Sequence, residues 1–199
     1  GNLAVTANGT ITDSGVIDVT GTTTLTAGPS NDITLDSANN FGGAVSVVSG
    51  RTITLKDSGA IDLGLSTISG NLNITASGQI SDSGILNVSG NTTLAAGSGN
   101  DITLDEANNF NGSVSVPSGR NVTLNDRNAI VLGTSTISGN LALTANGTIT
   151  DVGVIDVAGT TTLTAGPSND ITLDSANDFG GAVSVVSGRN VTLQDTGAI

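Results

Sequence analysis

The amino-acid sequence predicts an all-β fold, a parallel β-helix in which the chain winds as a solenoid of stacked strands. Three observations lead to this prediction. The 199 residues repeat with a period of 69, short stretches alternate between apolar and polar residues, and glycine, asparagine, aspartate and serine separate these stretches. Tandem units of this kind bury their apolar faces against their neighbours, so the array is expected to stack along one axis.

Three tandem repeats occupy residues 1–69, 70–138 and 139–199. The first and second agree at 45 of 69 positions, and the first and third agree at 53 of the 61 positions that they share. We therefore expect one continuous β-helix over residues 1–199, and any site in one repeat should be copied in the next. Since the third repeat stops before its 69th residue, the sequence is expected to be a fragment of a longer array.

Each repeat divides further into three segments that open on glycine, which are residues 1–20, 21–49 and 50–69 in the first repeat. Segments of about 20 residues suit one coil of a β-helix, so three coils per repeat and about nine coils in total are predicted. With about 4.8 Å between successive coils, the rod should be roughly 40 Å long. The segments begin at Gly1, Gly21, Gly50, Gly70, Gly90, Gly119, Gly139, Gly159 and Gly188.

Strands are expected at nine short stretches per repeat, three for each coil. In the first repeat these are LAVT, TIT and VIDV, then TTLT, DITL and AVSVV, then TITL, AIDL and STIS. Alternation with period two directs Leu3 and Val5 to one face and the residues beside them to the other. Short strands joined by corners of about three to five residues predict a coil of triangular section that pairs in parallel with the next coil.

Comparison of the repeats gives the direction of burial, because inward positions should accept only apolar exchange whereas outward positions can vary. We call the equivalent positions of the three repeats a column. Three apolar columns and two variable columns are predicted in this way. The inward columns are Val5, Ile74 and Leu143; Val16, Ile85 and Val154; and Ile53, Val122 and Val191. The outward columns are Lys56, Asn125 and Gln194, and Ser37, Glu106 and Ser175. Burial beneath the corner of the longer segment is expected for Phe41, Phe110 and Phe179.

Asparagine recurs at two expected corners of each repeat, where its side chain can bond the neighbouring backbone. One set is Asn31, Asn100 and Asn169, and the other is Asn39, Asn108 and Asn177. We expect both sets to act as turn formers. Identical asparagines would recur only every third coil, about 14 Å apart, which is too far for a direct ladder.

Composition narrows the functional classes. The net charge of −12, from 17 acidic and 5 basic residues, disfavours binding to nucleic acid and to anionic lipid. No apolar run is long enough to span a bilayer, so no membrane insertion of this segment is expected. An array of immunoglobulin-like sandwiches is the rival architecture, but a repeat with a single aromatic side chain would fill such a core poorly.

Catalysis is not predicted. Some β-helices degrade polysaccharides, but this chain has no His, Cys, Tyr or Trp. Paired carboxylates occur on one strand face at Asp32 and Asp36, and recur as Asp101 with Asp105 and Asp170 with Asp174. Because a glycosidase needs two unlike carboxyl environments in one cleft, we expect these pairs to serve solubility and edge protection. No catalytic, cofactor-binding or metal-ligating residue is assigned, and no cofactor is expected.

Three further features of the sequence bear on the surface of the solenoid. The stretch NDITLD offers carboxylate and amide oxygens to calcium, although the Gly-Gly-x-Gly-x-Asp sequence of calcium-binding β-rolls does not occur. Regular threonines could order ice, although Ala4 interrupts the array in the first coil. We expect neither activity, and we expect most Asn-x-Ser/Thr acceptor sequences to arise by chance. These lie at Asn8, Asn73, Asn91, Asn111, Asn121, Asn146 and Asn190.

The stretches GNLAVTANGTITDSGVIDVTGTTTLTAG and NDITLDSANNFGGAVSVVSG resemble the repeat region of filamentous haemagglutinin-type exoproteins, which are large adhesins of Gram-negative bacteria. The resemblance extends over the whole chain. It implies a right-handed parallel β-helix, export by two-partner secretion through an outer-membrane pore, and display at the cell surface as a long fibre. The amino-terminal secretion domain typical of that family is not among these residues, and the family's repeats carry no catalytic residues.

We therefore expect a non-enzymatic structural shaft of a secreted or cell-surface filamentous adhesin, located outside the cell on a Gram-negative bacterium. The shaft would project a distal binding region and support adhesion or biofilm formation. Its expected partners are further repeats of the same chain, with lateral contact to other filaments, a host receptor or polysaccharide as further options. The alternative is a carbohydrate-binding or matrix-scaffolding module that acts through the surface of the shaft.

Overall fold

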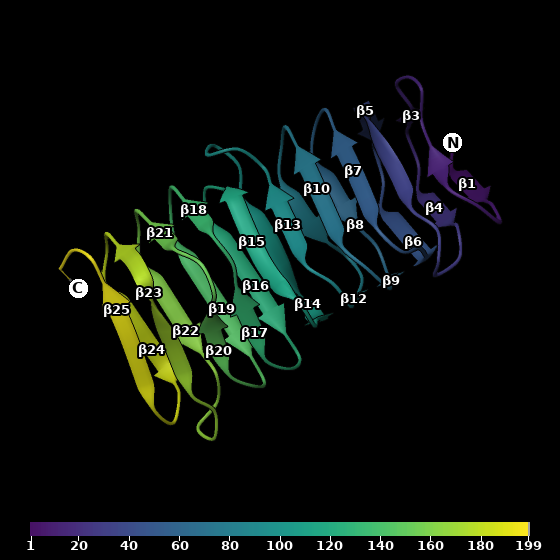
Figure 1. The fold of residues 1–199 in the computed structure, drawn as a ribbon. Helices are drawn as coiled ribbons and strands as arrows, with labels where there is room; N and C mark the ends of the chain where they lie inside the picture. The colour runs from purple at the N-terminus through teal and green to yellow at the C-terminus, as the bar shows by residue number, and fades with distance from the viewer. Residues whose placement is uncertain (199) are drawn as a thin grey trace.

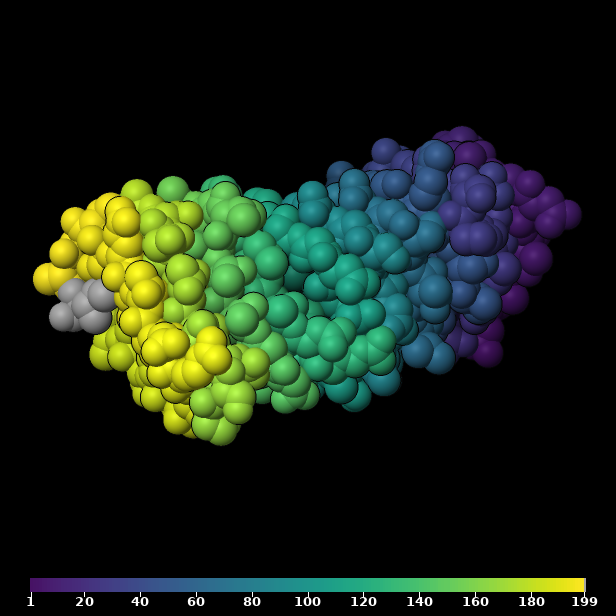
Figure 2. All heavy atoms as spheres, turned by 60° about the horizontal axis from the view of Figure 1, so that its bottom comes forward, coloured from purple at the N-terminus to yellow at the C-terminus, as the bar shows by residue number. Residues whose placement is uncertain are grey.

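The computed structural model describes residues 1–198, which contain strands, turns and bends. In Figure 1 the strands lie side by side as a stack, with the N-terminus at one end and the C-terminus at the other. In Figure 2 the colours follow one another along the rod in chain order, so each part of the chain packs against parts that are near in sequence. Within the described residues no helix could cross a membrane. The predicted all-β parallel solenoid of three repeats is confirmed.

Nine strands form in each complete repeat, at the nine stretches that the alternation indicates. The first repeat contains β1 (Leu3–Thr6), β2 (Ile11–Thr12), β3 (Asp18–Val19), β4 (Thr23–Thr26), β5 (Ile33–Phe41), β6 (Val45–Ser49), β7 (Ile53–Asp57), β8 (Ile61–Leu63) and β9 (Ser66–Ile68). The second contains β10 (Leu72–Ala76), β11 (Ile80–Asp82), β12 (Leu86–Val88), β13 (Thr92–Ala95), β14 (Ile102–Phe110), β15 (Ser113–Ser118), β16 (Val122–Asp126), β17 (Ile130–Leu132) and β18 (Ser135–Ile137). The third contains β19 (Leu141–Ala145), β20 (Ile149–Asp151), β21 (Ile155–Val157), β22 (Thr161–Thr164), β23 (Ile171–Phe179), β24 (Val183–Ser187) and β25 (Val191–Asp195).

Parallel pairing joins these strands into two sheets that enclose one core. The first sheet stacks ten strands in the order β1-β4-β6-β8-β11-β14-β16-β19-β22-β24. The second stacks β2-β5-β7-β10-β13-β15-β17-β20-β23-β25. The short strands β3, β9, β12, β18 and β21 form small ladders on a third side. Ten levels in each sheet correspond to about ten turns of the solenoid.

Successive repeats begin in opposite sheets. β1 opens the first repeat in the first sheet, its equivalent β10 lies in the second sheet, and β19 returns to the first. Each complete repeat supplies seven of the stacked strands, and since each strand accounts for half a turn, one repeat makes three and a half turns. This corrects the expected three coils per repeat and nine coils in total. The longest segment of the first repeat holds three stacked strands, β4, β5 and β6, and therefore makes a turn and a half.

The section of the solenoid is two-sided rather than triangular. Most turns also have a short third side, which lies on one of the two connections between the sheets. The connection that carries it changes from repeat to repeat. β3 lies on a connection from the second sheet to the first. β9 and β12 lie on connections from the first sheet to the second. β18 and β21 lie, like β3, on connections from the second sheet to the first. The third side therefore alternates between opposite edges of the rod.

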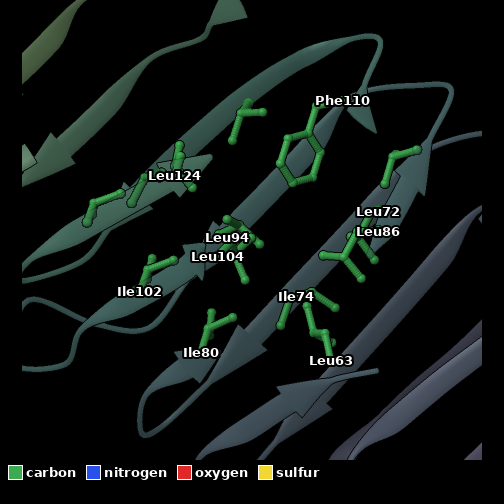
Figure 3. Packing of buried hydrophobic residues seen from close by; sticks show 14 of the residues in the cluster. Leu63, Leu72, Ile74, Ile80, Leu86, Leu94, Ile102, Leu104, Phe110 and Leu124 are labelled. Carbon is green, nitrogen blue, oxygen red and sulfur yellow. The ribbon is translucent and has the colours of Figure 1, made fainter. Parts of the chain in front are cut away.

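The core is a column of aliphatic side chains contributed by both sheets. Figure 3 shows part of it, with Leu94, Leu104 and Ile102 between the strands and Phe110 beside the third side. Each of these side chains is almost fully buried. The two sheets therefore share one continuous apolar interior.

Two of the predicted inward columns follow this interior. Ile74 and Leu143 are both about 1% exposed, and Val5, which lies in the first turn, is half-buried against the core, so the first column is confirmed as inward. In the second, Ile53 and Val122 are buried, whereas Val191 is 43% exposed because it lies in the last of the described turns. The predicted outward columns are also confirmed, since none of their members is buried.

One predicted inward column is wrong by a single residue. Val16 is 67% exposed and Val154 is 43% exposed. The adjacent residues point inward instead, because Leu86 and Ile155 are buried. The chain reaches the third side through the bend before β3, β12 and β21, and this bend shifts the alternation by one position.

The three phenylalanines fill the space where the third side meets the core. Phe110 is 2% exposed and lies opposite Val88 of the neighbouring turn. Phe41 and Phe179 repeat this contact in the other repeats. Their predicted burial is confirmed, although each ends a long strand rather than underlying a loop.

A bulge explains the proline inside β15. Leu25 pairs with Val47 whereas Thr26 pairs with Ser49, so Val48 is left out of the ladder and is 54% exposed. Pro117 occupies the equivalent position in the second repeat. Because proline has no N–H to donate, a bulge is one of the few places in a sheet that accepts it.

A buried hydroxyl without a partner recurs in every repeat. Thr92 is 1% exposed, lies between Leu72 and Val114 of the adjoining turns, and its Oγ1 has no hydrogen-bond partner within the described residues. Thr23 and Thr161 share this arrangement. An unpaired buried polar group costs about 1 to 3 kcal/mol.

Replacing Thr92 by valine should therefore stabilise the protein by about 1 kcal/mol, because valine keeps the shape and removes the unpaired hydroxyl. Thermal unfolding followed by circular dichroism measures the effect. The control is Thr93→Val on the outward face of β13, which should change stability by less than about 0.5 kcal/mol. A destabilised Thr92→Val variant would contradict the unpaired state of the hydroxyl.

Candidate functional site

The polar groups that the fold holds in fixed geometry form two ladders along the axis of the solenoid. Residues 1–198 contain no ligand-sized pocket. Within the same residues, no group of three or more acidic side chains is placed to hold a metal ion. One ladder, here called the buried ladder, lies inside the wall beside the phenylalanines. The other, the corner ladder, lies on the surface where turns begin.

The buried ladder is best seen in the second repeat, where it consists of Asp82, Asn108 and Asp126. Asn108 is fully buried. Its Oδ1 accepts from the Leu86 N–H at 2.8 Å, and its Nδ2 donates to Asp82 Oδ2 at 2.7 Å. Asp126 lies opposite Asn108 in the next turn and accepts from the Phe110 N–H at 2.9 Å. The ladder thus satisfies backbone donors that the bend in β14 leaves without sheet partners.

The same arrangement recurs in the other two repeats, as Asp13, Asn39 and Asp57 and as Asp151, Asn177 and Asp195. This corrects the expectation that Asn39, Asn108 and Asn177 are turn formers. They lie within long strands, and each side chain bonds the preceding turn from inside the wall. The expectation holds for the other set, because the Asn31 Nδ2 donates to the Ala27 carbonyl oxygen at 2.7 Å across a turn in which Gly28 has a φ of 85°.

Burial raises the pKa of Asp82 and of Asp126 above the usual value for an aspartate, and hydrogen bonds only partly offset this effect. Each carboxyl group therefore holds its proton to a higher pH in the folded chain than in the unfolded chain. Protonation of these two groups adds stability as the pH falls. The equivalent Asp13 of the first repeat differs, because its desolvation is outweighed by hydrogen bonds from Asn39 and from backbone N–H groups, which lower its pKa.

The outer surface carries an ion pair between adjacent turns in each repeat. Arg51 Nε and Nη2 donate to the two carboxylate oxygens of Asp32 at 2.8 and 2.7 Å. The Thr52 N–H also donates to Asp32, at 3.0 Å. The bonds from Arg51 and the Thr52 N–H hold the pKa of Asp32 at about 2. The equivalent pairs are Arg120 with Asp101 and Arg189 with Asp170.

The predicted carboxylate pair therefore has two unlike members. Asp32 is engaged by Arg51 and lies just before β5, whereas Asp36 is exposed on the outward face of that strand. The sequence predicted a shared face and a role in solubility. It missed the arginine one turn away, because Asp32 and Arg51 are distant in the sequence and become neighbours only when the length of the turn is known.

The corner ladder continues the bonds of this ion pair across turns. Asp101 Oδ1 accepts from the Asn121 N–H at 3.1 Å, and Asn121 Oδ1 accepts from the Asn140 N–H at 3.0 Å. Asn140 Oδ1 then accepts from the Thr160 N–H at 2.9 Å. Members of the ladder come from different positions of the repeat. A direct ladder is therefore formed, although equivalent asparagines were expected to lie too far apart.

Three of the glycosylation acceptor sequences take part in this ladder. Asn121 bonds the next turn as described, Asn91 Oδ1 accepts from the Ser113 N–H at 3.1 Å, and the Asn190 N–H donates to Asp170 Oδ1 at 3.1 Å. Asn8 and Asn146 lie in turns after β1 and β19, and Asn73 lies in β10. The acceptor asparagines thus fall in several different structural settings.

The fold and its ladders define a repeat protein of the β-solenoid class. The family described as "Repeats of unknown function (DUF5649)" matches residues 1–48, 50–117 and 119–186. The chain belongs to this family of repeats. The second and third matched segments begin at positions 50 and 119, in step with the period of the sequence. No curated protein and no solved structure matches the chain.

Replacing Arg51, Arg120 and Arg189 together by glutamine should reduce the loss of stability in acid. The folded pKa of Asp32 and of Asp170 is about 2, below the ordinary value of 3.8. The stability contributed by the ion pairs is thus present above about pH 4 and is lost as the pH falls to about 2. Melting temperatures between pH 6 and 2 measure this loss.

Lys56→Gln is the matched control, because Lys56 is exposed and forms no ion pair within residues 1–198. It should retain the pH dependence of the parent protein. If the triple variant and the parent lose melting temperature in parallel below pH 4, the ion pairs do not contribute as described.

Replacing Asn108 by alanine should lower the stability by about 2 kcal/mol, because the buried Leu86 N–H loses its acceptor and the half-buried Asp82 carboxylate loses one of its donors. Asn109→Ala removes a similar side chain from a half-exposed position in the same strand and should cost less than about 1 kcal/mol. Chemical denaturation compares the two variants. Equal effects would argue against a structural role for the buried ladder.

Proposed function

We propose that this chain is part of the shaft of a filamentous adhesin, exported to the surface of a Gram-negative bacterium, where it holds a binding region away from the cell. The observation that carries the proposal is the continuity of the two sheets through all three repeats. The sequence resemblance to filamentous haemagglutinin-type exoproteins supports the adhesin class and export by two-partner secretion.

Stiffness is the physical property that a shaft needs. The backbone hydrogen bonds of a parallel solenoid run along its axis, so bending stretches the bonds on one side of the rod. The aliphatic column resists compression, since its side chains are packed between neighbouring turns. The buried ladder and the corner ladder add side-chain bonds between turns at the edges of the sheets.

The charge of the surface suits a filament that stays soluble. Three of the five basic residues are engaged in the ion pairs with Asp32, Asp101 and Asp170. The remaining acidic residues leave the chain with a net charge of −12. Like charge on neighbouring shafts opposes unspecific association.

One observation favours a carbohydrate-binding or matrix-scaffolding module as the alternative. Thr12, Thr34 and Thr54 lie in register on adjacent strands of the second sheet and alternate with buried residues. Their hydroxyl groups are therefore offered to the outside about every 4.8 Å, a spacing at which an extended polysaccharide could be bonded. A glycan array and sedimentation of the 199-residue chain test this alternative, and a shaft should show neither selective sugar binding nor self-association.

The proposed shaft can be tested by measuring the length of chains that are extended by one and by two copies of residues 70–138. Small-angle scattering should show that the maximum dimension grows by about 17 Å for each added repeat, because each repeat makes three and a half turns of about 4.8 Å. Smaller and irregular increments would mean that the repeats bend or fold back.

Replacement within the producing bacterium tests the biological role. If the segment is a shaft, an unrelated β-solenoid of equal length should preserve surface display and adhesion, whereas deletion of residues 70–138 should reduce adhesion. If the equal-length replacement abolishes adhesion while surface display persists, the surface of these repeats itself binds the target.

A further inference from the structure

Equivalent residues of successive repeats lie on opposite edges of the rod. Thr10, Gln79 and Thr148 occupy the same position in the three repeats, and all are exposed. Thr10 and Thr148 precede β2 and β20, on connections that lead from the first sheet to the second. Gln79 precedes β11, on a connection that leads from the second sheet to the first. Gln79 therefore lies on the edge opposite to the other two.

Equivalent strands of successive repeats are accommodated equally well in the first and in the second sheet. β5 and β23 lie in the second sheet and their equivalent β14 lies in the first. The first residues of these strands, Ile33, Ile102 and Ile171, are all fully buried and pair with the same position of the following strand. Since no repeat is specialised for one side, each further repeat of this sequence should add the same half turn.

We propose that the number of repeats sets the side of the rod on which any following segment emerges. An odd number of added repeats turns the following segment by about half a revolution, and an even number restores its direction. Where the rod acts as a shaft, as proposed above, repeat number thus sets both the distance and the direction in which a binding region is presented.

The same geometry presents copies of each surface feature of the repeat on two opposite edges of the rod. A partner that recognises such a feature can therefore bind at either edge. The third-side ladder of β9, β12 and the end of β14 lies on one edge, and that of β18, β21 and the end of β23 lies on the other. Copies of one feature on one edge are separated by two repeats, or about 34 Å, and copies on the other edge are offset by about 17 Å. A partner is therefore offered two opposite rows of sites.

Pairwise distances between spin labels test the geometry in the full 199-residue chain. The chain has no cysteine, so Thr10→Cys, Gln79→Cys and Thr148→Cys can be labelled in pairs at exposed positions. We expect about 34 Å between positions 10 and 148, and more than about 20 Å from position 79 to each of them, because that vector also crosses the rod. Three labels on a straight line, with position 79 at half the full distance from each, would overturn the proposal.

A lengthened chain tests the consequence for repeat number. A copy of residues 70–138 is inserted after Ser138, and biotin is attached at position 10 and at the residue that corresponds to Thr148. Streptavidin should appear on the same side of the rod in electron micrographs of the original chain and on opposite sides in the lengthened chain. The same side in both would contradict the proposal. This outcome is distinguishable from failure of the shaft, because length increments and adhesion are measured independently of direction.

Discussion

Hydrogen bonding between successive turns is the constraint on which the rest of this structure depends. The strands of one turn use their backbone donors and acceptors on the turns before and after, so Leu72 of β10 lies in register with both Ile53 and Thr92. Because this register is kept, side chains at paired positions of successive turns stack along the axis in columns. All members of one column must therefore point inward, or all must point outward. The repeats are similar because each has to continue the ladder begun by its neighbour.

The polar groups inside the wall follow from the same constraint. At the bend in β14 the register shifts between Leu104 and Asn108, and the sheet no longer supplies a partner for every backbone N–H. Asn108, Asp82 and Asp126 take the place of the missing carbonyl oxygens, accepting from the N–H groups of Leu86, Asp105 and Phe110. Since a buried donor without a partner costs more than a hydrogen bond contributes, the sequence retains amide and carboxyl groups at a site that is otherwise apolar.

Alternation within single strands could be predicted from the sequence, because it depends on neighbours two residues apart. Alternation alone predicts that Ile74 and Leu143 are buried and that Lys56 is exposed, as observed. The number of turns could not be predicted in this way, because the longest segment of the repeat is compatible with either a long corner or a third stacked strand. The exposure of Val16 shows the same limit, since a bend shifts the alternation without any change in composition.

The buried ladder left a partial signal in the sequence. Asp57 follows Ile53 and Leu55 at the inward spacing, and aspartate is present at this position in all three repeats. This pattern could have indicated a buried carboxyl group. The bond between Asn39 and Asp13 could not have been found, because the two residues are distant in the sequence and meet only through the path of the turns.

Hydrogen–deuterium exchange at the junctions of the repeats tests the continuity of the stack most directly. The Gly70 N–H donates to the Arg51 carbonyl oxygen, and the Gly139 N–H donates to that of Arg120, both at 2.9 Å. If the three repeats form one unbroken solenoid, these amides should be as protected as those of the strands on either side of them. Rapid exchange at both junctions, with protection confined to the interior of each repeat, would show separate units joined by hinges and would contradict this account.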